Sequence, residues 1–333
     1  MPGRTLRCRL AVAAVLFTAI LPSRAPVHAA GPWAPERHVE LIVPAATGGS
    51  LDIMGRTIQQ MWIETKLFKP TSAVVNRAGG GHAVAYAYLA QKKGDGHVLS
   101  ITSPNLLAGH ITGTLSVTYR DFTPIAILLT ESIAFAVPAD SPIRTGRDLM
   151  EALRTKPEAY SVALSSAVGG THHLALGLPA KAAGVDMRKV KLVAFNSSGD
   201  ALVSILGGHV NIISTSSASL LPHVQSGKLR MIAVGAEKRL GAPFANVPTW
   251  AELGYPGVFD NWRGIIGAPG LTPEQTAYWE DGFRKLAATP AFASFAEKNQ
   301  LEPAFRGAAD ARRYMEKQYA EMKEVMGFLG LSK

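Results

Sequence analysis

Residues 39–52 read Val-Glu-Leu-Ile-Val-Pro-Ala-Ala-Thr-Gly-Gly-Ser-Leu-Asp, and this stretch decides the fold class. The apolar, β-branched run 39–43 predicts a buried strand, and a helical pattern follows from Asp52. The same order of strand, loop and helix returns over residues 73–90 and leads into a third strand at 98–102. This alternation is typical of a mainly parallel sheet with helices on both faces. The sequence therefore predicts an α/β protein that binds its ligand beyond the carboxyl ends of the strands.

The alternation starts again after a long extended stretch over residues 122–137. Further strands are expected at 160–164, 190–194, 210–214, 229–234 and 262–268. The simplest arrangement is two α/β lobes joined by two crossing segments, near residues 131–137 and 232–262. We expect one lobe to hold residues 30–131 and 245–333, the other to hold residues 137–232, and a ligand cleft to lie between them.

The first 29 residues have the features of a secretory signal peptide. Three arginines precede an apolar run, Leu10–Leu21, which is shorter than the about 20 residues that a membrane-spanning helix needs. The segment ends in Val27-His28-Ala29, with small residues at the two positions that a signal peptidase reads. We expect cleavage after Ala29 and export to the periplasm, with an uncleaved membrane anchor as the alternative.

Removal of this segment narrows the possible functions of the mature chain. The only cysteine, Cys8, leaves with it, so the mature protein has neither a disulfide nor a thiol site. Four arginines leave too, and the formal net charge falls from +9 to +5. No cluster of Lys and Arg of the kind that follows phosphates remains, which disfavours nucleic-acid binding.

Three loops place glycine and hydroxyl residues directly before a predicted helix: Ala46–Ser50, Ser165–Thr171 and Asn196–Gly199. The first turn of a helix carries unpaired N–H groups and a partial positive charge, so it can hold an anion without a cationic side chain. The alternative for each loop is an ordinary helix cap. Because three such loops each follow a predicted strand, they indicate an anion site.

Two charged residues allow two roles each. Asp52, at the first of these helix starts, could cap the helix or accept a hydrogen bond from a ligand. Arg263 could hold a carboxylate with its fork of donors, or form a structural ion pair near the crossing segments.

Histidines and serines raise the question of chemistry. His172 and His173 are adjacent and lie outside any HExxH pattern, so we expect neither a metal nor a cofactor. A hydrolase built from Ser166, a histidine and Asp200 stays an alternative, although the chain has no G-x-S-x-G motif.

Several short motifs, in this order and spacing, resemble the substrate-binding component of tripartite tricarboxylate transporters, also called the Bug family. Besides residues 43–52 with Arg56, they include the segments Asn76–Gly81, Tyr119–Ala126, Gly207–Val210 and Asn261–Gly264. The resemblance covers nearly all of the mature chain and is strongest to the tricarboxylate-type branch. It implies a two-lobed periplasmic binding protein of type II, the Venus-flytrap fold, that closes on an organic acid and performs no chemistry on it.

The resemblance also implies the residues that hold the ligand, partly through ordered waters. In the first lobe they are Ala45, Thr47, Gly48, Gly49, Asp52, Ser103 and Pro104, and in the second Ser166, Gly170, Thr171, His172, Gly199, Asp200, Ser216 and Ser217. We expect a monomer that delivers a small organic acid to membrane permease subunits; a sensory subunit that presents its ligand to a receptor is the alternative.

His172 departs from the family, which has an Asp at this position. If His172 faces the cleft, the usual histidine pKa of about 6.5 predicts tighter binding of an anion at lower pH.

Overall fold

The computed structural model describes Met1 and residues 33–195 and 197–331. The chain divides into two compact units, Met1–Pro32 and Trp33–Lys333, and all that follows concerns the second. The expected signal peptide and its cleavage site lie outside the described residues. Within the described residues, no helix is both long enough and apolar enough to cross a membrane.

The strands form two separate sheets. The first sheet has the order β11–β4–β10–β3–β1–β2, and the second has the order β7–β6–β8–β5–β9. The first consists of β1 Val39–Val43, β2 Ser72–Asn76, β3 Val98–Thr102, β4 Thr123–Glu131, β10 Asn261–Gly267 and β11 Leu301–Gly307. The second consists of β5 Ile133–Pro138, β6 Ser161–Leu164, β7 Lys191–Ala194, β8 Ile212–Ser216 and β9 Leu229–Val234.

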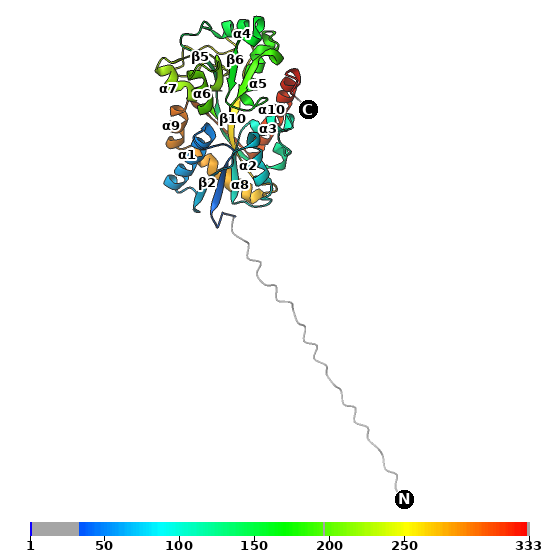
Figure 1. Cartoon of the computed structure of the whole chain (residues 1–333). Coiled ribbons are helices and arrows are strands. Elements are labelled where there is room, and N and C mark those ends of the chain that lie inside the picture. The colour runs from blue at the N-terminus through cyan, green and yellow to red at the C-terminus, as the bar shows by residue number, and fades with distance from the viewer. Residues whose placement is uncertain (2–32, 196, 332–333) are drawn as a thin grey trace. The chain divides into compact units, whose positions relative to one another are not determined.

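Ten α-helices are described around these sheets (Figure 1). They are α1 Ser50–Thr65, α2 Ala83–Ala90, α3 Asn105–Ile111, α4 Gly146–Thr155, α5 Thr171–Ala182, α6 Ser198–Leu206, α7 Ser217–Gln225, α8 Pro273–Ala287, α9 Pro290–Lys298 and α10 Ala308–Phe328. Short 3₁₀ turns lie at Gly80–His82, Tyr119–Asp121, Pro157–Ala159 and Met187–Lys189. Helix α4 begins at Gly146, because the Thr145 hydroxyl accepts a hydrogen bond from Asp148 N (3.1 Å) and caps the helix there.

Both sheets are mixed, so the prediction of a mainly parallel sheet is wrong. Strand β1 is parallel to β2 and β3, and β6 is parallel to β7 and β8. In contrast, β10 is antiparallel to β3 and β4, and β5 is antiparallel to β8 and β9. Parallel neighbours need a crossover, usually a helix. Strands β4 and β5 carry the chain through Ser132 into the second sheet, and β9 and β10 carry it back without a helix between them. The returning strands therefore run antiparallel to the outgoing ones, β9 to β5 and β10 to β4.

Alternate residues of the strands enter different cores. On β1, Leu41 and Val43 pack with α1, α8 and α9, whereas Ile42 packs with α2, α3 and α10. On the second sheet, Val162 of β6 packs with α4 and α5, whereas Ala163 packs with α6 and α7. This period of two is the pattern of strands that are covered on both faces.

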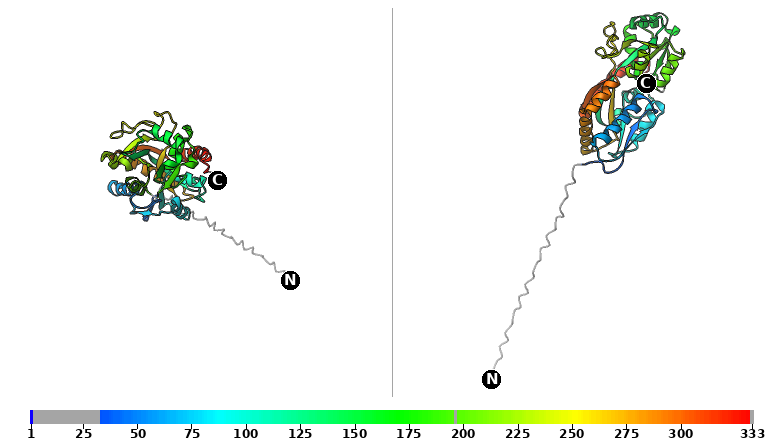
Figure 2. Two further views of the ribbon diagram at one scale, coloured as in Figure 1. Left: turned by 45° about the horizontal axis from the view of Figure 1, so that its top comes forward. Right: turned by 90° about the vertical axis from the view of Figure 1, so that its left-hand side faces the viewer.

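The core is continuous on one side of the molecule and interrupted on the other. One cluster of buried residues joins α2, α3 and α10 beside the first sheet to α4 and α5 beside the second. On the opposite side, the core under α1, α8 and α9 is separate from the core under α6 and α7. Figure 1 shows α10 running from beside α3 up to α5, and the right-hand view of Figure 2 shows the second sheet with its helices (green) at one end of this unit.

Candidate functional site

The loop after β1 opens the first turn of α1. Gly48 has φ 83°, and Gly49 precedes the helix with φ −82° and ψ 170°. No side chain caps the helix start, and Ile53 N donates the first helical hydrogen bond to Gly49 O (3.0 Å). A positive φ favours glycine, so Gly48 is what lets the chain turn from strand to helix here.

The carboxylate of Asp52 fixes the conformation of this loop through hydrogen bonds. Its carboxylate accepts hydrogen bonds from Gly48 N (2.9 Å), Arg56 Nε (3.0 Å) and Asn76 Nδ2 (2.8 Å), and the residue is buried. Burial alone would raise the pKa of Asp52, but the hydrogen bonds from Arg56, Gly48 and Asn76 lower it overall. Both oxygens are engaged within the protein, which supports the structural role over direct contact with a ligand.

The loop after β6 has the same backbone course. Gly169 has φ 83°, and Gly170 precedes α5 with φ −79° and ψ −176°. Gly169 N donates to His173 Nδ1 (3.1 Å), as Gly48 N donates to Asp52. Here, however, Thr171 N donates to Asn105 Oδ1 (3.3 Å) at the start of α3, so the helix start is covered by a residue from beside the first sheet.

The third loop has an ordinary cap. Asn196 lies outside the described residues, and the Ser197 hydroxyl accepts from Asp200 N (3.1 Å) at the start of α6. Asp200 is exposed and accepts a second hydrogen bond from Ser197 Oγ (2.9 Å). The starts of α6 and α1 nevertheless line one cavity together.

This cavity has a volume of about 300 Å³ and lies where the core is interrupted. Its polar end consists of Gly48, Gly49, Ser50, Ser198 and Gly199, and its apolar wall includes Ile53, Met54, Leu129, Leu202, Phe295 and Leu301. Glu131 and Arg263 line it too. A volume of this size is at the lower end of small-molecule sites, which combine apolar walls with a few directed polar groups.

Arg263 and Glu131 form a buried ion pair on adjacent strands. The Arg263 guanidinium donates from Nη2 to Glu131 Oε2 and from Nη1 to Asn261 Oδ1 (2.7 Å). Asn261 Nδ2 in turn donates to Glu131 Oε2 (3.3 Å). Glu131 is 2% exposed and Arg263 7% exposed. Arg263 thus forms a structural ion pair and also lines the cavity, so the structural role and a role in ligand binding are both open to it.

Several buried polar atoms near this pair have no hydrogen-bond partner among the described residues. They are Glu131 Oε1, both ring nitrogens of His172, Ser216 Oγ and Ser217 Oγ. Ser216 pairs with Ile133 across the second sheet, and Ser217 N donates to Ser132 O (3.0 Å), so both serines lie beside the β4–β5 crossing. Buried polar groups are rarely left without a partner, so this cluster has unused hydrogen-bonding capacity.

His172 is neutral over the pH range where the sequence predicts a switch. Burial, and then the positive charge of Arg263, lower the pKa of His172 to about 3. In this structure the imidazole therefore does not take up a proton between pH 7.5 and pH 5.5.

The structure separates the sixteen candidate residues into groups. Gly48, Gly49, Gly199 and Arg263 line the cavity. The buried candidates outside its lining are Asp52, Ser103, Pro104, Gly170, Thr171, His172, Ser216 and Ser217, and the less buried ones are Ala45, Thr47, Ser166 and Asp200. Sequence reasoning did not propose Glu131 or Asn105, and it included Ser198 only as part of the loop Asn196–Gly199. Glu131 did give a signal, as a charge between two apolar runs.

The residues considered for a hydrolase are not joined by hydrogen bonds. Ser166 Oγ donates to Ala167 O (3.4 Å), and Asp200 is engaged with Ser197. The ring nitrogens of His172 have no partner among the described residues. A serine nucleophile needs a base within hydrogen-bond reach, so this set shows no catalytic relay.

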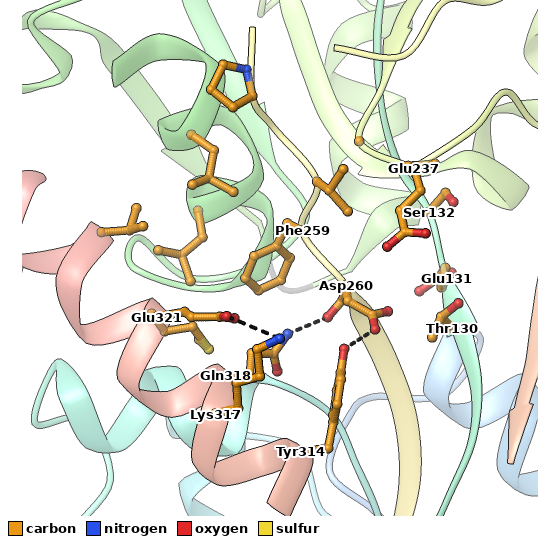
Figure 3. Close-up of a pocket in the computed structure, with 18 of the residues that line it drawn as sticks. Thr130, Glu131, Ser132, Glu237, Phe259, Asp260, Tyr314, Lys317, Gln318 and Glu321 are labelled. Carbon is orange, nitrogen blue, oxygen red and sulfur yellow. Dashed lines mark hydrogen bonds and ion pairs between the residues drawn. The ribbon is translucent and has the colours of Figure 1, made fainter. Parts of the chain in front are cut away.

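A larger cavity of about 1350 Å³ lies beside α10 and is shown in Figure 3. Tyr314 and Gln318 of α10 point toward Asp260: Tyr314 Oη donates to its carboxylate, and Gln318 Nε2 donates to its backbone O (2.7 Å). Burial raises the pKa of Asp260 although Tyr314 donates to it. Seven acidic and five basic side chains line this cavity. The smaller cavity suits an anion better, because two helix starts open into it.

Comparison with known proteins places this geometry in a family. The chain matches the sequence model of the tripartite tricarboxylate transporter family receptor over residues 56–331. Protein BugT of Bordetella pertussis is 29% identical over 271 residues, which are 80% of this chain and 80% of that protein.

Two solved structures resemble the chain. A TctC solute-binding protein from Polaromonas, solved without ligand, is 27% identical with a TM-score of 0.69, over 88% of this chain and 99% of that chain. An R. palustris protein solved with adipate is 24% identical with a TM-score of 0.81, over 90% of this chain and 99% of that chain. The two-lobed α/β fold predicted from the sequence is thereby confirmed.

Proposed function

Because this chain belongs to the tripartite tricarboxylate transporter receptor family, we propose that it binds a small carboxylate-bearing molecule between its two sheets. The protein then delivers this molecule to the membrane permease subunits of such a transporter. The observation that carries the proposal is the 300 Å³ cavity into which the starts of α1 and α6 open. Free N–H groups at a helix start bind carboxylates. The structural neighbour that holds adipate supports a carboxylate ligand.

We include in the ligand site the candidate residues outside the cavity lining as well, with Asp52 acting by holding the loop after β1 in place. The unpartnered atoms of His172, Ser216 and Ser217 supply hydrogen bonds, directly or through water, when the ligand enters. We assign residues 30–131 and 245–333 to one lobe and 137–232 to the other, and expect them to move apart to admit the ligand. Export to the periplasm, cleavage near Ala29, a monomeric state and the absence of catalysis belong to the same proposal.

A thermal-shift screen of organic acids tests the proposal. A ligand that binds only the folded protein stabilises it by about 2.7 kcal/mol at 100 times its dissociation constant, which is a measurable rise in melting temperature. We expect a rise with one or more carboxylates, and none with neutral sugars or divalent metal ions. A shift with a sugar or a metal and with no carboxylate contradicts the proposed ligand class. Mass spectrometry of small molecules released from the purified protein identifies the acid.

A further inference from the structure

We propose that this cavity selects monocarboxylates that carry a neutral or positively charged group at the far end, and that it rejects di- and tricarboxylates. The inference rests on the proposed function and narrows its ligand class. It follows from the charges that line the cavity.

The positive charge of Arg263 is already engaged. Its guanidinium contacts the Glu131 carboxylate and Asn261 Oδ1, and a further hydrogen bond from Nη1 reaches Trp262 O (3.3 Å). Both side chains of the ion pair are buried, at 9% and 1% exposure. Separating a buried pair leaves an uncompensated charge, so Arg263 stays with Glu131 and does not become a free clamp for a second carboxylate.

The other oxygen of Glu131 has no hydrogen-bond partner among the described residues. Oε1 is buried and accepts no hydrogen bond from the described residues, and Glu131 lines the cavity. A buried carboxylate oxygen of this kind is stabilised by a donor, such as a hydroxyl or ammonium group of a ligand. A ligand carboxylate at the same place would meet a like charge in a site of low solvent exposure, which is unfavourable.

Another part of the cavity lining suits one carboxylate. It consists of the starts of α1 and α6, at Gly48–Ser50 and Ser198–Gly199. The Asp52 carboxylate, which accepts a hydrogen bond from Gly48 N, already offsets part of the positive charge at the start of α1. This limits how much further negative charge the two helix starts can hold. The apolar wall formed by Leu202, Phe295 and Leu301 then suits the uncharged body of the ligand. The remaining ionisable residue of the lining is His223.

Three acids of equal chain length test this inference without any mutation. Hexanoate, 5-aminopentanoate and adipate each have four methylene groups after the carboxylate and differ only in the group at the far end, which is a methyl, an ammonium or a carboxylate. Titration calorimetry with these acids, and with the corresponding sets that have two and six methylene groups, measures the three affinities at each length. At the length that fits best, we expect the amino acid to bind at least about tenfold more tightly than the diacid, with the monoacid between them.

The variant Glu131→Gln sharpens the test. It removes the negative charge and frees Arg263, so the ratio of diacid to amino-acid affinity should rise at least about tenfold. Glu302→Gln, at an exposed carboxylate on β11 that lines the other cavity, is the matched control and should keep the wild-type ratio. If Glu131→Gln fails to fold, as a melting curve would show, the ranking in the wild-type protein still decides.

Each outcome separates the two proposals. Binding of the diacid as tight as or tighter than that of the amino acid and the monoacid overturns the selection, while the proposed binding of a carboxylate stands. No binding by any acid at any length contradicts the proposed function and the inference with it.

Discussion

The loops after β1 and β6 have nearly the same backbone and opposite surroundings. In each, a glycine with φ 83° precedes an uncapped helix start, and its N–H bonds the side chain four residues later. After β1 that side chain is the carboxylate of Asp52, and the helix start opens into a cavity. After β6 it is the imidazole of His173, and Asn105 covers the helix start.

The difference shows that neighbouring residues decide whether a helix start is open or covered. The loop after β1 lies on the side where the core is interrupted, and the loop after β6 lies on the side where the core is continuous. Nearly the same local geometry therefore gives a helix start that opens into a cavity in one half and a helix start covered by Asn105 in the other.

The largest expected effect comes from substituting the matched glycines. A β-carbon at Gly48 meets nothing within 4 Å, whereas one at Gly169 would lie 2.7 Å from Thr112 Cγ2. Gly48→Ala should lower the free energy of unfolding by about 1–2 kcal/mol through its positive φ alone. Gly169→Ala should cost about 1–3 kcal/mol more through the overlap with Thr112. Urea denaturation measures both.

Thr112→Ser is the control for this comparison, since it removes Cγ2 and keeps the hydroxyl that bonds Ala108 O (3.0 Å). Added to Gly169→Ala, it should bring the loss close to that of Gly48→Ala. Equal losses for the two single glycine variants would show that the lobes do not touch at this loop.

The next effect concerns pH. Burial lowers the pKa of His173 to about 4, from the about 6.5 expected in the unfolded chain. The unfolded state therefore binds the proton first, and the stability present above pH 6.5 is lost as the pH falls toward 4. At pH 5 the free energy of unfolding should be about 2 kcal/mol lower because of His173, and lower by a similar amount because of His172. The pKa of Asp52 is lowered below 3.8, so its contribution is lost only at still lower pH.

Urea denaturation at pH 7 and pH 5 checks this difference between the loops. His173→Gln should reduce the fall in unfolding free energy between the two values, whereas Asp52→Asn should not. The exposed His209 provides the control, as His209→Gln should leave the fall unchanged. A fall that is unaffected by His173→Gln would place the proton uptake elsewhere.

The smallest effect is a substitution that imitates an anion at the covered helix start. Asn105→Ala removes the acceptor for Thr171 N and should lower stability by about 0.5–1.5 kcal/mol. Asn105→Asp puts a carboxylate at the start of α5 and should raise stability by about 0.3–1 kcal/mol at neutral pH. The melting temperature should be highest with Asp at position 105, intermediate with the native Asn and lowest with Ala. If Asn105→Asp lowered the melting temperature as much as Asn105→Ala, the start of α5 would not favour anions.

The sequence predicted most of the fold because apolar runs and helical periodicity are local signals. It missed α3 and α7, which are short and contain Gly109 and Pro222, respectively. It missed β11 as well, since a partly buried edge strand that includes Pro303 lacks the alternation of a half-buried inner strand. The family expected from the motifs is confirmed by the match over residues 56–331.

For the candidate site, the sequence located the three loops but not the contacts between distant residues. The ion pair between Glu131 and Arg263 joins positions 132 residues apart, and the bond from Thr171 to Asn105 spans 66 residues. Such contacts depend on how the strands pair and how the two halves meet. A single sequence carries no signal for that register.

The end of helix α10 offers a site where a fluorescent dye could report the relative position of the two halves. It packs against α3 in one half and α5 in the other, and near its end the exposed Phe328 ring lies 5.3 Å from Lys181 Nζ of α5. The chain has a single cysteine, which lies in the expected signal peptide, so Phe328→Cys would give the mature protein one thiol for a fluorescent dye. The proposed opening of the lobes would move α5 relative to α10, so the emission of a dye at that position would report this motion in real time.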